Sequence, residues 1–154
     1  MPKVGIGVTD GPREATINRS EANPLLPEDG GMTVETVTPD ELEAAESTPG
    51  VVRETVFETA NNVMVRSRVA PGTTTGWHHH GDRHVYGYVI EGSGAVEYGS
   101  SGGETAETST GEFFYISPGT VHRDINPTSE ETVVLVNFVG TGPAVVNVDG
   151  PGAE

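Results

Sequence analysis

Short β-prone runs, separated by turns that contain glycine, fill the chain from residue 51 to residue 148. They comprise residues 51–56, 63–70, 85–90, 95–98, 113–116, 132–138 and 144–148. Each run is short and rich in valine, isoleucine, phenylalanine or tyrosine, which is typical of strands. Many short strands joined by turns favour a closed β-barrel or a jelly roll. We therefore expect an all-β domain, with the glycine- and serine-rich residues 99–104 forming a hairpin loop.

The N-terminal part of the chain has a different character. Residues 1–31 show no sustained hydrophobic period, so we expect an irregular extension that lies against the core or against a neighbouring subunit. Residues 38–46 begin with a threonine cap, a proline and acidic residues, which predicts a short helix. The predicted organisation is thus an N-terminal arm, residues 1–31, followed by one barrel domain over residues 32–154.

Charge and composition exclude several classes of function. The 23 acidic residues against 8 basic ones give a formal net charge of -15, which argues against nucleic acid as a partner. Spread along the chain, these acids favour a solvated surface suited to high salt, and so a halophilic source. No apolar run is long enough for a membrane span and no leader pattern is visible, so we expect a cytoplasmic protein. Cysteine is absent, so metal ligands must be nitrogen or oxygen.

Four of the five histidines fall within seven residues, at His78, His79, His80 and His84, and the fifth is His122. A metal site needs several imidazoles that converge on one point, whereas histidines that serve packing alone would be scattered. Residues two apart on a strand share a face, so His78 and His80 point the same way and His79 points oppositely. This spacing predicts that the first two bind a metal and that His79 does not.

Two longer motifs surround these histidines. Residues 72–92 contain a glycine, five residues and His-x-His, followed by Tyr-Val-Ile-Glu-Gly; residues 111–126 contain Gly-Glu-Phe-Phe-Tyr-Ile-Ser-Pro-Gly-Thr-Val-His and end at an asparagine. In order and separation the pair resembles the two motifs of the cupin superfamily. The resemblance covers roughly residues 65–140. It implies a cupin-type jelly-roll barrel that holds a metal inside.

The resemblance implies two histidines and a glutamate from the first motif and one histidine from the second as metal ligands. His78, His80 and His122 match three of these positions, but the glutamate has no counterpart. Its place falls on His84 or Val85, and because imidazole binds transition metals and valine cannot, we expect His84 to be the fourth ligand. Pleat geometry then predicts that Tyr86 and Tyr88 also face the pocket, whereas an inward Val85 would bring Gly87 and Val89 with it.

The sequence leaves the reaction open, since cupins include dioxygenases, isomerases, decarboxylases and proteins that only bind. We expect one divalent transition metal (Fe, Zn, Ni, Mn or Cu) and a small-molecule ligand or substrate. The leading hypothesis is an iron-type dioxygenase of a small oxygenated compound such as a diketone or enol. The alternatives are a non-catalytic metal or small-ligand binding protein and a sugar isomerase. By analogy with other cupin-like barrels, we also expect a homodimer.

No catalytic acid or base is identified by the sequence. Glu91 and Asp124 are the acids closest in sequence to the candidate ligands, but the chain alone does not place them in the pocket. Arg83 and Arg123 each flank a candidate ligand, and either could orient a substrate carboxylate or form a surface ion pair. Asn126 and the Pro118–Gly119 pair are expected to shape turns around the second motif.

Overall fold

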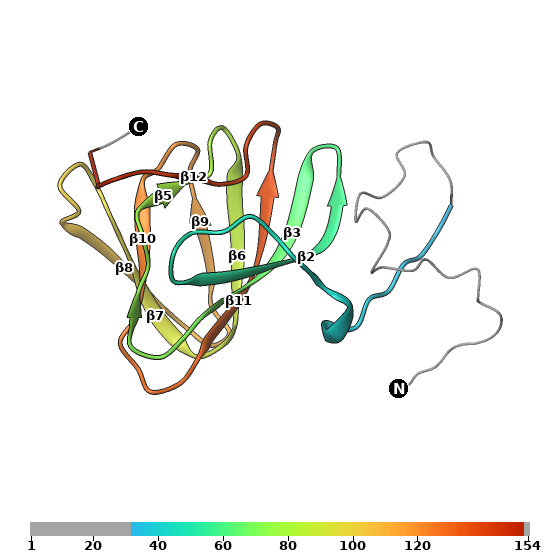
Figure 1. Ribbon diagram of the computed structural model, residues 1–154, viewed down its shortest axis with the longest axis horizontal. Helices are drawn as coiled ribbons and strands as arrows, with labels where there is room; N and C mark the ends of the chain where they lie inside the picture. Colours follow the sequence, from blue (N-terminus) through green and yellow to red (C-terminus); the bar gives the residue numbers. More distant parts are fainter. Residues whose placement is uncertain (1–31, 153–154) are drawn as a thin grey trace.

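The computed structural model describes residues 32–152, which form two β-sheets that face each other across one core (Figure 1). The extension predicted for residues 1–31 lies outside the described residues. The inward residues of one sheet are mostly valine and phenylalanine, and its Val63, Val65, Val85, Val136 and Phe138 form the centre of the core. Because strand residues alternate between faces, this pattern leaves polar and aromatic residues on the outside of the barrel.

The first sheet, in the spatial order β1-β2-β3-β11-β6-β9, is antiparallel throughout the described residues. Its strands are β1 (Glu43–Ala44), β2 (Val51–Thr59), β3 (Asn62–Val69), β6 (His84–Glu91), β9 (Phe113–Ile116) and β11 (Thr132–Val139). In the pair of β6 with β9, Val85 lies opposite Ile116 and Gly87 lies opposite Phe114. This register matters for the site, because it fixes which residues of β6 face the interior.

The second sheet follows the order β12-β5-β10-β7-β8, with β4 also paired to β10. Its strands are β4 (Thr73–Thr74), β5 (His78–His79), β7 (Ser93–Tyr98), β8 (Glu104–Ser109), β10 (His122–Asn126) and β12 (Val146–Asn147). β7 and β8 form the hairpin that the sequence predicted around residues 99–104. Each of the seven predicted runs contains a strand, and within residues 32–152 the structure adds β1, β4, β5, β8 and β10.

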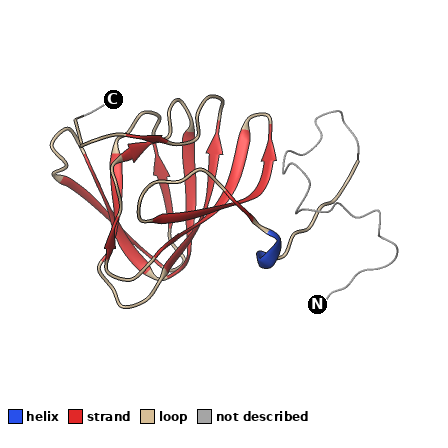
Figure 2. Ribbon diagram, viewed as in Figure 1, coloured by secondary structure: helices blue, strands red, loops and turns tan. Residues whose placement is uncertain are grey.

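The helix expected over residues 38–46 is wrong in extent. The structure has a single 3-10 turn, Pro39–Glu41, which is the isolated helical segment outside the barrel in Figure 2. The start signals act as predicted, since the Glu41 carboxylate accepts a hydrogen bond from the Thr38 backbone N–H at 2.8 Å. From Leu42 the backbone is extended, and Glu43–Ala44 pairs with β2 instead of continuing a helix. Sheet pairing therefore overrides the local helix preference.

Within the described residues, no helix could span a membrane.

Candidate metal centre

Three histidine side chains converge inside the barrel. His78 lies on β5, His80 follows it directly and His122 begins β10. His78 and His122 are cross-strand partners, and their ring centroids are 4.3 Å apart. The His80 ring lies 5.2 Å from that of His78 and 5.1 Å from that of His122. One ring nitrogen from each lies within 4.8 Å of the other two, so the set could hold a metal ion.

The backbone fixes how each of these rings is oriented. The Nδ1 atoms of His78, His80 and His122 lie 2.9, 2.7 and 2.8 Å from the carbonyl oxygens of Gly76, Ala144 and Thr120, respectively. A carbonyl oxygen can only accept, so each Nδ1 carries the proton and each Nε2 keeps its lone pair. Hydrogen bonds of this kind are typical of metal-binding histidines, because they fix tautomer and ring orientation.

Burial disfavours the charged form of His78 and His80. His78 and His122 are 1% exposed and His80 is 4% exposed. Desolvation, reinforced by the neighbouring His122, lowers the pKa of His78 to about 4 and that of His80 to about 2. The Nε2 atom of His78 is buried and has no hydrogen-bond partner among the described residues. A buried nitrogen without a partner is costly, and a cation bound at the centre of the three rings would satisfy it. The donor set therefore fits a metal ion.

His84 does not join this group, contrary to the prediction. It lies on the outer face of β6, is exposed, and its Nδ1 is 2.7 Å from the Tyr115 hydroxyl oxygen. Tyr86 and Tyr88 share this outer face, with exposures of 51% and 37%, so they do not line the cavity either. Val85 is 2% exposed and faces the interior together with Gly87 and Val89. The pairing of β6 with β9 and β11 sets this register, which the local spacing of residues alone could not decide.

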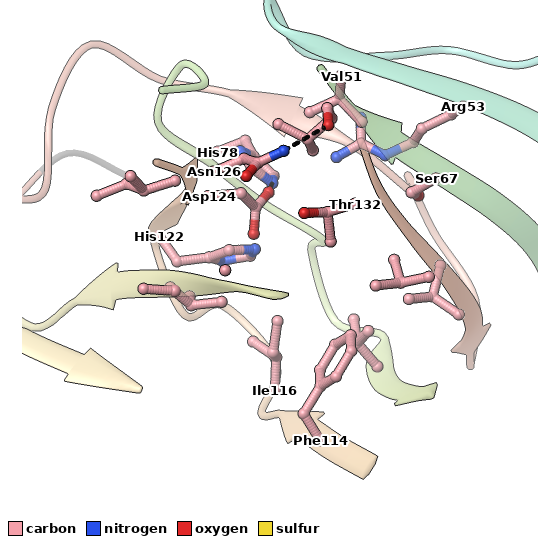
Figure 3. Close-up of a pocket in the computed structure, with 18 of the residues that line it drawn as sticks. Val51, Arg53, Ser67, His78, Phe114, Ile116, His122, Asp124, Asn126 and Thr132 are labelled. Atoms are coloured by element: carbon pink, nitrogen blue, oxygen red, sulfur yellow. Dashed lines mark hydrogen bonds and ion pairs between the residues drawn. The ribbon is translucent and has the colours of Figure 1, made fainter. Parts of the chain in front are cut away.

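The three histidines open onto a cavity of about 80 Å³ between the two sheets. One side is apolar, with Val85, Phe114 and Ile116 among its lining residues, and Figure 3 shows the latter two beneath the histidines. Asp124 also lines the cavity, because it lies two residues after His122 on the same face of β10. Its Oδ2 is 3.8 Å from His78 Nε2. Glu91, the other acid considered from the sequence, is exposed.

The arginine that reaches the cavity is not one of those singled out by sequence. Arg83 donates from Nε to the Gly142 carbonyl at 2.9 Å, and Arg123 pairs with Glu97 at 2.8 Å; the cavity lining includes neither arginine. Arg53 of β2 lines the cavity instead and is 4% exposed. A signal was available, since strict alternation over residues 51–56 places this arginine on the same face as Val51.

Asn126 holds the loops at the end of β10, as expected for the last residue of the second motif. Its side-chain nitrogen donates to the carbonyls of Val69, Ala70 and Glu130 at 3.0, 3.2 and 2.8 Å. Its side-chain oxygen accepts from the backbone and hydroxyl of Thr128. These bonds join β3 to the loop before β11 and so support the strand that carries His122.

Comparison with known proteins agrees with this architecture. The cupin domain family matches residues 65–138. The polyketide cyclase RemF from Streptomyces resistomycificus superposes with a TM-score of 0.63 at 23% identity, over 75% of this chain and 86% of its own. A conserved protein of Klebsiella pneumoniae with a double-stranded β-helix domain superposes with a TM-score of 0.62 at 21% identity. The match covers 76% of this chain and 99% of that protein. No curated protein matches the chain.

Oxalate decarboxylase from Bacillus subtilis is a further structural neighbour, with a TM-score of 0.59 and 24% identity. The match covers 69% of this chain and 30% of that larger enzyme. At these identities the likeness concerns the fold, and the neighbours differ in activity among themselves. The family match, the shared fold and the two motifs agree that residues 65–138 form a cupin domain.

Proposed function

We propose that this protein binds one divalent transition metal through His78, His80 and His122 and acts as an iron-type dioxygenase on a small oxygenated substrate. The observation that carries the proposal is the convergence of three imidazoles whose Nδ1 atoms are all held by backbone carbonyls. Nitrogen-rich sites with open coordination positions suit iron among other metals, and bound iron(II) would supply the activation of dioxygen.

The protein's own residues favour a chelating, electron-rich substrate. Neutral imidazoles leave the charge of a divalent ion uncompensated, so an anionic or enolised oxygen ligand gains more than a neutral one. The motif spacing places the family's glutamate at His84 or Val85, and of these Val85 lines the cavity but cannot bind a metal, which leaves one ligand fewer and more room for the substrate. The apolar wall around Phe114 and Ile116 would exclude water from the reacting atoms.

Proton transfer without oxygen is a second candidate, favoured by the placement of Asp124. This carboxylate lines the cavity 3.8 Å from the Nε2 atom of His78, within reach of a ligand bound there. It could accept a proton from a carbon made acidic by the metal, as an isomerase or lyase requires. Tyr86 and Tyr88, which the sequence placed in the pocket, lie on the outer face and cannot take this role. Manganese(II) centres, named for the decarboxylase of Bacillus subtilis, would suit such chemistry here.

The test is metal content followed by oxygen uptake. After anaerobic loading, we expect near-stoichiometric iron(II) in the wild-type protein and in His84→Ala, which is the matched control. The variant His80→Ala should lose the iron. Oxygen uptake with pentane-2,4-dione or pyruvate should follow the iron content. If iron is bound but no oxygen is consumed, the dioxygenase proposal is wrong. Substrate turnover in the absence of oxygen would support the proton-transfer candidate instead.

A further inference from the structure

Arg53 places a buried positive charge in the cavity. It extends from β2, on the sheet that faces the histidines, and Figure 3 shows its guanidinium directed across the pocket towards the side that carries His78 and Asp124. Its side chain is 4% exposed, so water cannot solvate it as it would a surface arginine. Burial lowers the pKa of Arg53, while Asp124 and Glu46 oppose that shift. Guanidinium nevertheless stays charged in proteins.

This charge has few partners. Nη1 donates to the Thr48 hydroxyl at 3.1 Å, while the buried Nε atom has no hydrogen-bond partner among residues 32–152. Within the same residues no carboxylate forms an ion pair with it, and Asp124 acts on it through longer-range attraction. An arginine has five N–H donors in a planar fork, so most of its bonding capacity remains unused. A buried cation without an ion pair lowers the stability of the fold unless an anion binds to it.

We propose that Arg53 is a substrate-positioning residue that binds a carboxylate, so that the ligands of this cavity are small carboxylic acids carrying a second, metal-binding oxygen. This proposal rests on the proposed metal site, because the metal would bind the second oxygen of the ligand. The Nε atom without a partner can take part in a forked contact with a carboxylate, which a neutral carbonyl cannot equal. Ser67, on the neighbouring strand β3, lines the same cavity and offers a further hydroxyl.

The size of the cavity limits such a ligand. Its volume of about 80 Å³ corresponds to roughly five to eight water molecules, since one water needs ~10–15 Å³. A compound of a few heavy atoms, such as a 2-oxo acid, fits this space. The neutral diketone expected from the sequence would fit too, but it would leave the guanidinium uncompensated. The inference therefore narrows the substrate class from oxygenated compounds in general to short oxo or hydroxy acids.

The test compares two ligands of nearly equal shape, pyruvate and butane-2,3-dione, which differ in charge. Calorimetry on the zinc-loaded protein avoids turnover, and zinc content is measured in parallel. We expect the wild type to bind pyruvate at least about tenfold more tightly than the diketone. Arg53→Met should weaken pyruvate binding by about tenfold or more, change diketone binding little and keep its zinc. Arg66→Met is the control, since it removes a cation from the outer face of β3.

Two further measurements separate failure of this inference from failure of the metal site. Arg53→Lys keeps the charge without the fork, and we expect pyruvate affinity between those of the wild type and Arg53→Met; it also serves if the methionine variant does not fold. In chelator-treated wild type, pyruvate should still raise the melting temperature more than the diketone does. The inference is overturned if Arg53→Met keeps the preference for pyruvate, or if the wild type has none. Absence of zinc binding in the wild type would refute the proposed metal site and with it the ligand's second contact, but not carboxylate binding by Arg53.

Discussion

At the level of single residues, His78 and His80 are held in the state that a metal needs. Their Nδ1 protons are engaged by backbone carbonyls, and their burial disfavours a second proton. In the unfolded chain both would titrate near the ordinary histidine pKa of about 6.5. Between that value and the lowered folded values, the unfolded state binds more protons than the folded state. The free energy of unfolding of the metal-free protein must therefore fall as the pH falls.

We predict that metal-free wild-type protein loses stability from pH 7 to pH 5, with a slope of at most about 1.4 kcal/mol per pH unit from each of His78 and His80. His80→Gln should lose less over the same range, because glutamine does not titrate. Urea unfolding at several pH values, followed by circular dichroism, measures the difference. The many acidic side chains titrate in both proteins and cancel in the comparison. Equal slopes in the two proteins would contradict the assignment of His80 as a buried neutral base.

At the level of strands, β6 decides which residues belong to the site. Its alternation places Val85 against the core and His84 at the surface, and the partner strands β9 and β11 fix that choice. Gly87 is part of the same arrangement: a Cβ atom there would lie 2.1 Å from Cζ of Phe114, so the ring packs directly on the glycine. A shift of one residue would put a tyrosine into that space, and the observed register is therefore the one the core can accept.

We predict that Val85→Glu changes the response to metal. Without metal, a glutamate at this buried position should lower the free energy of unfolding by about 2–4 kcal/mol. With zinc, the carboxylate gains a partner inside the cavity, so zinc should stabilise the variant more than it stabilises the wild type. Urea unfolding with and without zinc tests this. His84→Glu, one residue earlier and on the outer face, is the control and should behave like the wild type. Equal stabilisation of wild type and Val85→Glu by zinc would argue against the cavity as the metal site.

The strand level also shows what sequence can and cannot decide. All seven predicted runs contain strands, because their apolar and β-branched residues match a buried pleated surface. Strands such as β4 and β10 were missed because they are short and polar, and they form through pairing with each other and through the pairing of β10 with β7. Ligands two residues apart were predictable from strand period alone. Whether His84 or Val85 faces the cavity depends on the pairing of β6 with strands distant in sequence. The position of Arg53 in the cavity likewise depends on how the two sheets pack against each other.

At the level of the whole molecule, high negative charge is combined with an exposed apolar area on the part of the surface that residues 32–152 form. Tyr86, Tyr88, Phe113 and Tyr115 form cross-strand pairs on the outer face of β6 and β9, here called the outer aromatic face. Phe113 is 78% exposed. Exposed aromatic rings grouped in this way favour association with another protein surface. The halophilic source and cytoplasmic location expected from the sequence stay predictions.

The expected homodimer can be tested on the outer aromatic face. We predict that the wild type sediments as a dimer at micromolar concentration and that Phe113→Glu, which adds a charge within the apolar area, sediments as a monomer. Val52→Glu is the control, since this residue is 50% exposed on β2, away from β6 and β9 in the same sheet. Because each chain carries a formal charge of -15, repulsion should weaken the dimer at low ionic strength and salt should strengthen it. A wild-type monomer in both low and high salt would refute the dimer, and a dimer retained by Phe113→Glu would place its interface elsewhere.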